Sequence, residues 1–293
     1  MHRAIEPVYD ECSPPGSMQL APVPQSLRSK GAVSLSFRNR SGRIAPGRTH
    51  QSGCLRARFP RPAEPGETPC AVLINTSGGV ADGDRLDHRI EWDEHSAATV
   101  TTQAAEKVYR ALAAGGAIET RLEVMRGASA EWLPQETILF DGSRLRREAR
   151  IILAEDVTFL GVEAVVLGRQ AMGKTMRRGS LRDRMRIWRG GKLIYADSLA
   201  LGGDIAALMK RAAIGKGAAA MAVIVHASAD AGKLLEPVRD ALAPARGQAA
   251  ASSWNGLLAV RLLAPDGEAL RHDIVAALGV LREGRPLPRV WRC

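Results

Sequence analysis

The stretch Ile118-Glu-Thr-Arg-Leu-Glu-Val124 alternates apolar or small side chains with charged ones, residue by residue. A period of two places the first set on one face of a β-strand and the charged set on the other. Val33-Ser-Leu-Ser-Phe37 alternates in the same way, and residues 157–167 are apolar enough for a strand covered on both faces. Residues 185–199 are typical of a hairpin turning at Gly190-Gly191, since glycine tolerates positive φ. This part of the chain is expected to be mainly β.

Helical spacing occurs only in the C-terminal third. Asp230 is expected to cap a helix that ends near Pro244, with apolar residues at 234, 235, 238 and 242 on one face. After an apolar strand over residues 257–263, the turn Pro265-Asp-Gly267 leads to a second helix. The apolar positions of that helix are Leu270, Ile274, Val275, Leu278 and Leu281. We therefore expect a large β domain that carries two α-helices near its end.

Composition indicates a folded protein without a membrane segment. The 293 residues are 45% hydrophobic and 25% charged, which is ordinary for a globular chain. Residues 1–30 contain five prolines and no apolar periodicity, so we expect a flexible Pro-rich leader, with residues 31–293 forming a single domain. No stretch approaches the ~20 apolar residues of a spanning helix, and no signal peptide is recognisable, which favours the cytoplasm. The four cysteines are scattered and are expected to be reduced thiols.

A basic field marks the chain between Lys174 and Lys192. The sequence has 41 basic and 31 acidic residues, and eight of the basic ones lie in this field, with Asp183 the only acid among them. Such a field attracts phosphates or acidic protein surfaces. An ordinary solvated surface is an alternative interpretation of equal weight. Binding to single-stranded nucleic acid would require aromatic side chains for base stacking, and only Trp188 lies within the field. We therefore expect no nucleic-acid partner.

Residues 168–175, Gly-Arg-Gln-Ala-Met-Gly-Lys-Thr, match the phosphate-binding pattern G-x-x-x-x-G-K-[ST] and follow an apolar strand. A P-loop NTPase is thus the alternative function. In such a site the loop opens a helix whose N-terminus binds the phosphates. Here Gly179 interrupts after four residues and an alternating hairpin follows. A Gly-rich turn between strands is the favoured interpretation.

The histidines give only weak evidence for a metal site. His88 and His95 flank Glu91, Asp93 and Glu94, which suggests a transient metal cluster, but residues 86–92 have the pattern of a polar-faced strand. Solvation of these side chains at the surface is favoured. No Ser/His/Asp or Cys/His catalytic set can be assembled from the local sequence, and no enzymatic activity is expected.

Several blocks taken together resemble the UreD (also called UreH) family of urease accessory proteins. Residues 75–86, Asn-Thr-Ser-Gly-Gly-Val-Ala-Asp-Gly-Asp-Arg-Leu, are similar to the family block NT-x-GG-x-x-GGD-x-L. Residues 101–110 are similar to TTQAAEK-x-YR, and residues 132–140 to WLPQE-x-I-x-F. Residues 163–173, 254–258 and 287–291 resemble later signatures. The blocks occur in family order from about Gly31 to Trp291.

Two positions depart from the family pattern. Asp82 replaces the first glycine of the GGD block, and Lys174 stands where relatives have glutamate. The second change also creates the apparent P-loop. Because Lys174 replaces that glutamate, a metal path in this chain would have no carboxylate at position 174.

The resemblance implies a mainly β fold of solenoid-like, stacked β-sheets with two α-helices in the C-terminal third. It further implies a non-enzymatic maturation chaperone that assembles with UreF and the GTPase UreG, docks on apo-urease and helps to insert nickel. No tightly bound cofactor is expected, and nickel would be held only transiently. Asp84 is the candidate for the polar nickel path, because a carboxylate oxygen can hold Ni²⁺ and release it, and capping of a tight turn is its alternative role. Tyr109, Arg110, Trp132 and Gln135 are candidates for partner contact or fold support.

Overall fold

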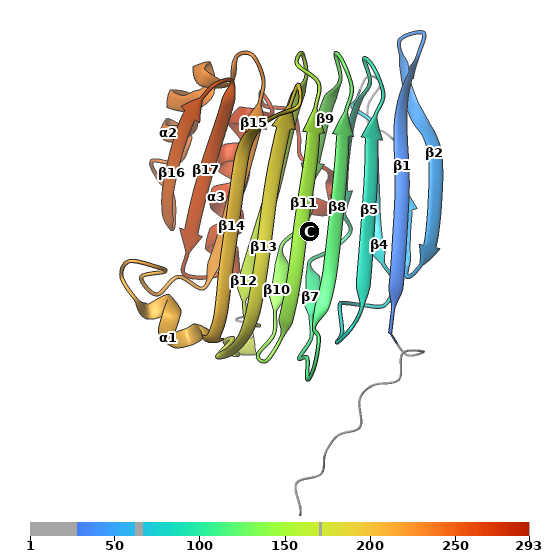
Figure 1. Cartoon of the computed structure of the whole chain (residues 1–293). Coiled ribbons are helices and arrows are strands. Elements are labelled where there is room, and N and C mark those ends of the chain that lie inside the picture. The colour runs from blue at the N-terminus through green and yellow to red at the C-terminus, as the bar shows by residue number, and fades with distance from the viewer. Residues whose placement is uncertain (1–27, 62–66, 170–171, 293) are drawn as a thin grey trace, which may run out of the picture.

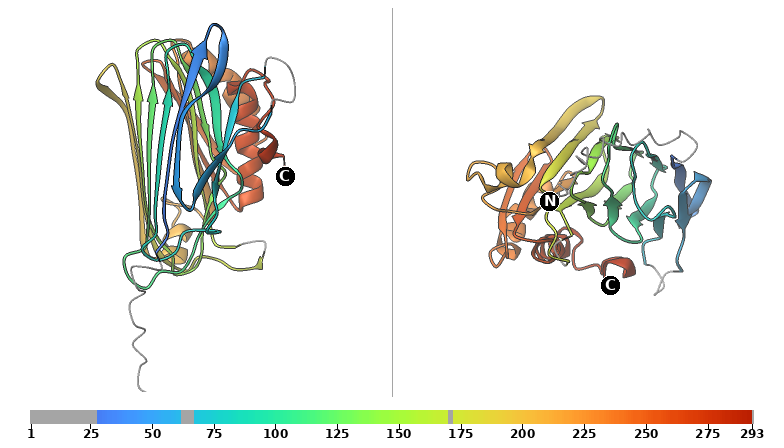
Figure 2. Two further views of the ribbon diagram at one scale, coloured as in Figure 1. Left: turned by 90° about the vertical axis from the view of Figure 1, so that its right-hand side faces the viewer. Right: turned by 90° about the horizontal axis from the view of Figure 1, so that it is seen from below.

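The chain winds between two stacked β-sheets, which we call sheet A and sheet B. The computed structural model describes residues 28–61, 67–169 and 172–292, and the expected leader of residues 1–30 lies almost entirely outside them. Sheet A faces the viewer in Figure 1 with sheet B behind it, and the edge-on view in Figure 2 shows the two layers. The mainly β architecture expected from the alternation is confirmed.

Sheet A has seven strands. Their order is β14 (Lys192–Asp204), β13 (Arg178–Arg189), β11 (Arg144–Leu153), β8 (Gly116–Val124), β5 (Arg85–Trp92), β1 (Lys30–Arg40) and β2 (Arg43–Gly53). Sheet B has ten strands, eight of which follow one path: β16 (Gln248–Trp254), β17 (Leu257–Ala264), β15 (Ala220–Ala227), β12 (Thr158–Leu167), β9 (Ser129–Leu133), β6 (Ala97–Thr102), β4 (Cys70–Asn75) and β3 (Leu55–Arg58). Off this path, β10 (Thr137–Leu139) pairs with β12 and with β7 (Glu106–Val108).

Successive circuits of the chain stack in parallel, which makes the fold solenoid-like. From β4 to β13 the backbone passes from one sheet to the other and returns beside its own previous strand. Arg85 thus lies beside Ala117, which lies beside Arg146. Strands paired in this way are parallel because each return is made through the opposite sheet. Antiparallel pairs end the stack, with β1–β2 and β13–β14 in sheet A and β3–β4 and β15–β17–β16 in sheet B.

The turn between β13 and β14 follows the sequence expectation. Gly190 and Gly191 have φ of 52° and 78°, a region that L side chains rarely adopt. A Cβ at Gly190 would also lie 1.8 Å from the Glu155 carboxylate. The Glu155 side chain is exposed and can move aside, so it is the positive φ that requires glycine here.

Two hydrophobic cores explain the sequence patterns. The first lies between the sheets and includes Phe37, Trp92 and Phe159, all fully buried. The second lies between sheet B and the helices and includes Leu160 and Val162 of β12. β12 contributes to both cores, so its nearly continuous apolar run is that of a strand covered on both faces.

The two expected helices are present, with differences at the first of them. α2 spans Leu235–Ala241 and α3 spans Gly267–Leu281, and a short helix that was not expected, α1 (Ile205–Lys210), follows β14. The prediction that Asp230 caps the first helix is wrong, because a 3₁₀ turn, η3 (Ala231–Leu234), comes first and Asp230 pairs with Lys233 at 2.7 Å instead. Asp266 caps α3 by accepting from the Ala269 amide at 2.7 Å. No helix in the described part of the chain has the length and apolarity needed to cross a membrane.

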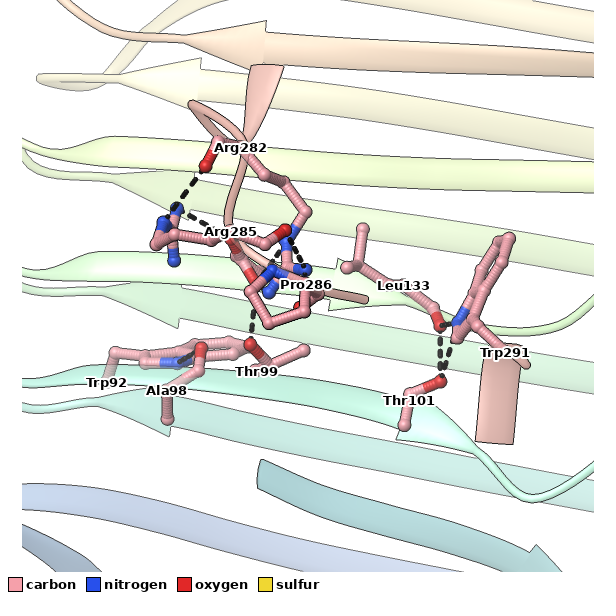
Figure 3. A network of polar contacts seen from close by, with 10 residues as sticks. Trp92, Ala98, Thr99, Thr101, Leu133, Arg282, Arg285, Pro286 and Trp291 are labelled. Atoms are coloured by element: carbon pink, nitrogen blue, oxygen red, sulfur yellow. Dashed lines mark hydrogen bonds and ion pairs between the residues drawn. The ribbon is translucent and has the colours of Figure 1, made fainter. Parts of the chain in front are cut away.

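The C-terminal segment is fastened to sheet B by buried polar contacts (Figure 3). Arg282, at the end of α3, forms an ion pair with Glu131 of β9 at 3.0 Å, and Glu131 also accepts from Thr99 and from Arg285. The Trp291 indole, in the final 3₁₀ turn η4 (Arg289–Trp291), donates to Thr101 Oγ1 and to the Leu133 carbonyl, both at 3.1 Å. These bonds hold the last elements of the chain against strands from its middle.

Replacing Glu131 by Gln should destabilise the fold strongly. Arg282, whose side chain is only 5% exposed, would keep its charge without a buried carboxylate beside it. Removing one partner of such a pair costs about 3–5 kcal/mol, to be measured by urea unfolding. The matched control is Glu236→Gln, which breaks an exposed pair with Arg239 on α2 and should change stability by about 0.5 kcal/mol or less. Equal losses in the two variants would contradict a stabilising role for the buried pair.

Candidate functional site

Asp84 lies in the turn before β5 and is buried, with 4% of its surface exposed. Its two carboxylate oxygens accept from the backbone amides of Ser29, at 2.7 Å, and Ala81, at 2.8 Å. The side chain thus joins the segment before β1 to the turn that begins β5. In the described structure Asp84 braces a turn, and its place on a nickel path stays a prediction.

Asp82, the substitution for a family glycine, braces a second turn. Its carboxylate accepts from the amides of Leu112, Ala113 and Gly115 at 2.7–3.0 Å. Partial burial opposes ionisation, but these backbone bonds outweigh it and lower the pKa of Asp82. The departure from the family pattern therefore has a structural role, which is to hold the loop that precedes β8.

Tyr109 and Arg110 lie on the exposed rim between β7 and β8. The Tyr109 hydroxyl donates to the Gly78 carbonyl at 3.0 Å, and its ring packs against the edge of Phe140 at 5.3 Å. A Cβ at Gly79 would come within 2.4 Å of the same ring, which explains the glycine. With 39% of its surface exposed, Tyr109 both supports the turn and is available for contact.

Trp132 belongs to a buried polar network between the sheets. Its indole nitrogen donates to Glu163 Oε1 at 3.1 Å, and Glu163 pairs with Arg147 at 2.6 Å. Arg147 also forms a double contact with Asp183, at 2.5 and 3.0 Å. Glu163 comes from sheet B, whereas Arg147 and Asp183 come from adjacent strands of sheet A.

Two acids share one base in this network. Burial disfavours the Arg147 cation, but Asp183 and Glu163 outweigh burial and raise the pKa of its guanidinium, so it stays charged. Burial raises the pKa of the Glu163 carboxyl, and the Arg147 charge opposes that rise. Two carboxyl groups thus face one guanidinium, and Glu163, whose pKa is raised, is the one that can exchange its proton for another cation.

Two cavities meet at this network. The first, of about 270 Å³, is lined by Glu106, Trp132 and Gln135 among others, and the second, of about 300 Å³, is lined largely by apolar side chains such as Met185 and Met209. Arg147 and Glu163 line both. Of the predicted residues, Trp132 and Gln135 therefore border the first cavity, whereas Asp84, Tyr109 and Arg110 do not line it.

Gln135 links the first cavity to the C-terminal segment. Its amide nitrogen donates to the Val290 carbonyl at 2.9 Å, and its amide oxygen accepts from Arg271 at 2.7 Å. Its backbone amide donates to Thr102 Oγ1. The side chain is 6% exposed, so its contacts in the described chain are those of fold support.

Glu106 was not singled out from the sequence, yet it lines the first cavity. Burial, and then the nearby charge of Asp84, raise the pKa of its carboxyl to about 7, while a hydrogen bond from Asn75, at 3.1 Å, opposes the rise. Arg147 was missed as well. The alternation of β11 could have revealed it, because this pattern places Arg147 on the inward face of the strand with Leu145, Ala149 and Ile151.

The surface interpretation of the histidines is wrong for His88. It lies on the inward face of β5, its exposed fraction is 8%, and its Nδ1 is 3.2 Å from Thr120 Oγ1. Burial lowers its pKa to about 4, so it is neutral at neutral pH. His95 lies apart in an exposed turn. Within the described ranges no three His, Cys, Asp or Glu side chains are placed to hold a metal ion together.

The alternative based on residues 168–175 is not supported by the structure. Gly168 has φ of 96° and packs against the Lys174 carbonyl, and a Cβ there would come within 2.4 Å of that oxygen. Residues 174–177 have no regular secondary structure and the chain enters β13 at Arg178, so the described residues that follow the motif form no helix. The helix N-terminus that a P-loop requires is missing there. The motif is a Gly-rich turn between strands, as favoured above.

The expected free thiols are confirmed for Cys54 and Cys70, and Cys12 and Cys293 lie outside the described residues. Taken together, the features define a solenoid-like β-protein with paired charges and cavities between its sheets. The sequence model of the family described as UreD urease accessory protein matches residues 29–292.

Similar proteins agree with this match. The urease accessory protein UreD of Azorhizobium caulinodans is 42% identical over 272 residues, covering 93% of this chain and 99% of its own. Proteins of the same name from Bradyrhizobium diazoefficiens and Xanthobacter autotrophicus are 43% and 46% identical, over 91% and 90% of this chain and 95% and 90% of their own. The chain belongs to the UreD family of urease accessory proteins, which supports a role in urease maturation.

Replacing Glu106 by Gln should change the pH dependence of stability. A carboxyl whose pKa is raised to about 7 binds more protons when folded than when unfolded, so stability falls as pH rises from 4.5 to 7. Glutamine cannot ionise, and its amide oxygen can still accept from Asn75. The variant should match the native protein near pH 4 and exceed its unfolding free energy by roughly 3 kcal/mol near pH 8. Parallel pH profiles of the two proteins in urea unfolding would contradict the raised pKa.

Proposed function

We propose that this chain is a non-enzymatic maturation chaperone that acts in the cytoplasm as a scaffold in a complex with UreF and the GTPase UreG. The complex docks on apo-urease and helps to insert nickel into its active site. Family membership over nearly the whole chain supports a place in urease maturation. Under this proposal nickel is a cargo held transiently, and no cofactor stays bound.

The observation that carries the nickel proposal is that two carboxyl groups share one guanidinium between the two cavities. Arg147 neutralises only one of the two carboxylates, Glu163 and Asp183, and Glu163 borders both spaces. A divalent cation is attracted to such a site because Coulomb interactions are strong where water is scarce. Carboxylate oxygen is a donor that can bind Ni²⁺ and release it.

Other donors line the same first cavity at separate points. Neutral His88 offers an imidazole nitrogen, which suits nickel, and Glu106 offers a carboxylate. Since these side chains are not gathered into a three-ligand cluster within the described residues, each would hold the ion weakly. Weak holding at successive donors is what delivery requires, in contrast to storage. Asp84 contributes to this proposal through its charge, which reaches Glu106.

Replacing Glu163 by Gln should reduce the nickel content of urease several-fold when the urease gene cluster is co-expressed. The amide removes the second carboxyl group, while Arg147 keeps Asp183 as its partner. Nickel per urease is measured by atomic absorption. The control is Glu119→Gln, an exposed change on the outer face of β8. Asp84→Asn is tested in the same way. It removes the carboxylate charge but keeps one side-chain oxygen that can accept a hydrogen bond from a backbone amide.

Co-elution with UreF and the thermal midpoint must be unchanged for a nickel defect to be interpreted in this way. Normal nickel loading in Glu163→Gln would remove the support that the buried network gives to the proposal. Normal loading in Asp84→Asn would leave Asp84 with the turn-bracing role alone.

The chain alone should bind neither ATP nor GTP in the presence of magnesium, since Lys174 is followed by a β-strand and not by a helix. Lys174→Glu, which restores the family residue, should keep urease activation intact. Isothermal titration with each nucleotide checks the first expectation, and urease activity after co-expression checks the second. Saturable binding that disappears in Lys174→Ala would show that the turn is a nucleotide site after all.

A further inference from the structure

The outer face of sheet A is left uncovered by the described chain. Figure 1 looks directly onto this face, and in Figure 2 the helices α2 and α3 lie on the far side of sheet B. The outward positions of β5, β8 and β11 are almost all charged, whereas their inward positions fill the core. An exposed sheet face of this kind is available for contact with another molecule.

Parallel register arranges the charges of this face in rows that cross the strands. One row, which we call the first cation row, consists of Lys30, Arg85, Arg146 and Arg182, with Ala117 between the second and third. All four cations are exposed. With strands ~4.8 Å apart, the row spans about 19 Å.

A second cation row runs parallel to the first, nearer the other end of the strands. It consists of Arg89, Arg121, Arg150 and Arg186. Each of these arginines has an intramolecular partner. The ion pairs are Arg89–Asp87, Arg121–Glu123 and Arg186–Glu148, at 2.6–3.3 Å, and the Arg150 guanidinium lies 4.7 Å from the Trp188 ring centroid.

The first cation row lacks such partners. Within the described part of the chain, no carboxylate lies within 4.0 Å of its four cationic groups, and their side chains make no hydrogen bond there. Like charges on directly opposite strand positions, as at Arg146 and Arg182, destabilise a sheet. The fold therefore carries an unneutralised row beside a neutralised one, on the same face and the same strands.

We propose that the first cation row is a docking surface for an acidic polypeptide segment of a partner protein. Carboxylates spaced along an extended segment can lie over the row and supply the missing counter-charges, which gives specificity and speeds association. A nucleic acid fits less well. The first row contains no aromatic side chain for base stacking. A row of carboxylates, Asp87, Glu119 and Glu148, lies about 7 Å away along the strands and repels any anionic partner that is broader than a single extended segment, as a duplex is. The inference does not depend on the proposed role in nickel delivery.

The test compares two variants of the full chain that each lose two positive charges. Arg146→Gln/Arg182→Gln alters the first cation row, and Arg89→Gln/Arg121→Gln alters the second. The probe is a fluorescein-labelled, glutamate-rich peptide of about twelve residues, long enough at ~3.3 Å per residue to cross the row. Fluorescence anisotropy at physiological salt should show binding weakened about tenfold in the first variant and less than about twofold in the second.

A further variant at the other end of the row, Lys30→Gln/Arg85→Gln, should weaken binding as Arg146→Gln/Arg182→Gln does. The thermal midpoint of the first-row variants should stay the same or rise, because like-charge repulsion is relieved. Absence of peptide binding by the native protein, or equal losses in variants of both rows, would overturn the proposal. Tighter binding of a duplex DNA, lost in the same first-row variants, would overturn it in favour of a nucleic-acid surface.

Discussion

The parallel register between successive circuits is the constraint on which the rest of this structure depends. A slip of one residue in β5, β8, β11 or β13 would exchange the inward and outward side chains of that strand. In the observed register, Ile118 and Leu122 of β8 lie on the core side with Leu145 and Ile151 of β11. The same register brings Arg147 beside Asp183 and sets it opposite Glu163. The core, the buried charges and the rows of surface arginines are therefore consequences of one alignment.

Much of the fold could be predicted because its signals are local. Alternation in β1 and β8, the two-sided apolar run of β12 and the spacing within α3 each need only neighbouring residues. The solenoid-like winding followed from family resemblance and not from periodicity, since partners such as Arg85 and Ala117 are a whole circuit apart. α1 was missed because its six residues are too few to show a helical period. His88 was wrongly placed at the surface. The alternation of residues 86–92 shows that the strand has two faces, but it does not show which of them is buried.

The candidate site could be predicted less fully, because its chemistry arises from contacts between distant strands. Trp132 and Gln135 were named from a family block, and both border the first cavity, but their partners Glu163 and Val290 come from other parts of the chain. The meeting of two carboxyl groups at Arg147 appears only when three strands are brought together. Asp84 shows the opposite situation. Its turn was visible in the sequence, and the backbone amides that occupy both its oxygens were not.

The antiparallel pairs that end the stack bear on whether the solenoid can continue into a second copy of the chain. A parallel solenoid has, in principle, an open edge at each end onto which a strand of another copy could add. Here the outermost strand of sheet A at one end, β2, includes Pro46, which has no amide hydrogen to offer, and the β1–β2 pairing shifts register between Leu35 and Phe37. At the other end the chain reverses at Gly190-Gly191, so β14 runs against the direction of the circuits. Reversal of direction at one edge of sheet A and an irregular pairing at the other make both edges poor templates for continuing the parallel stack.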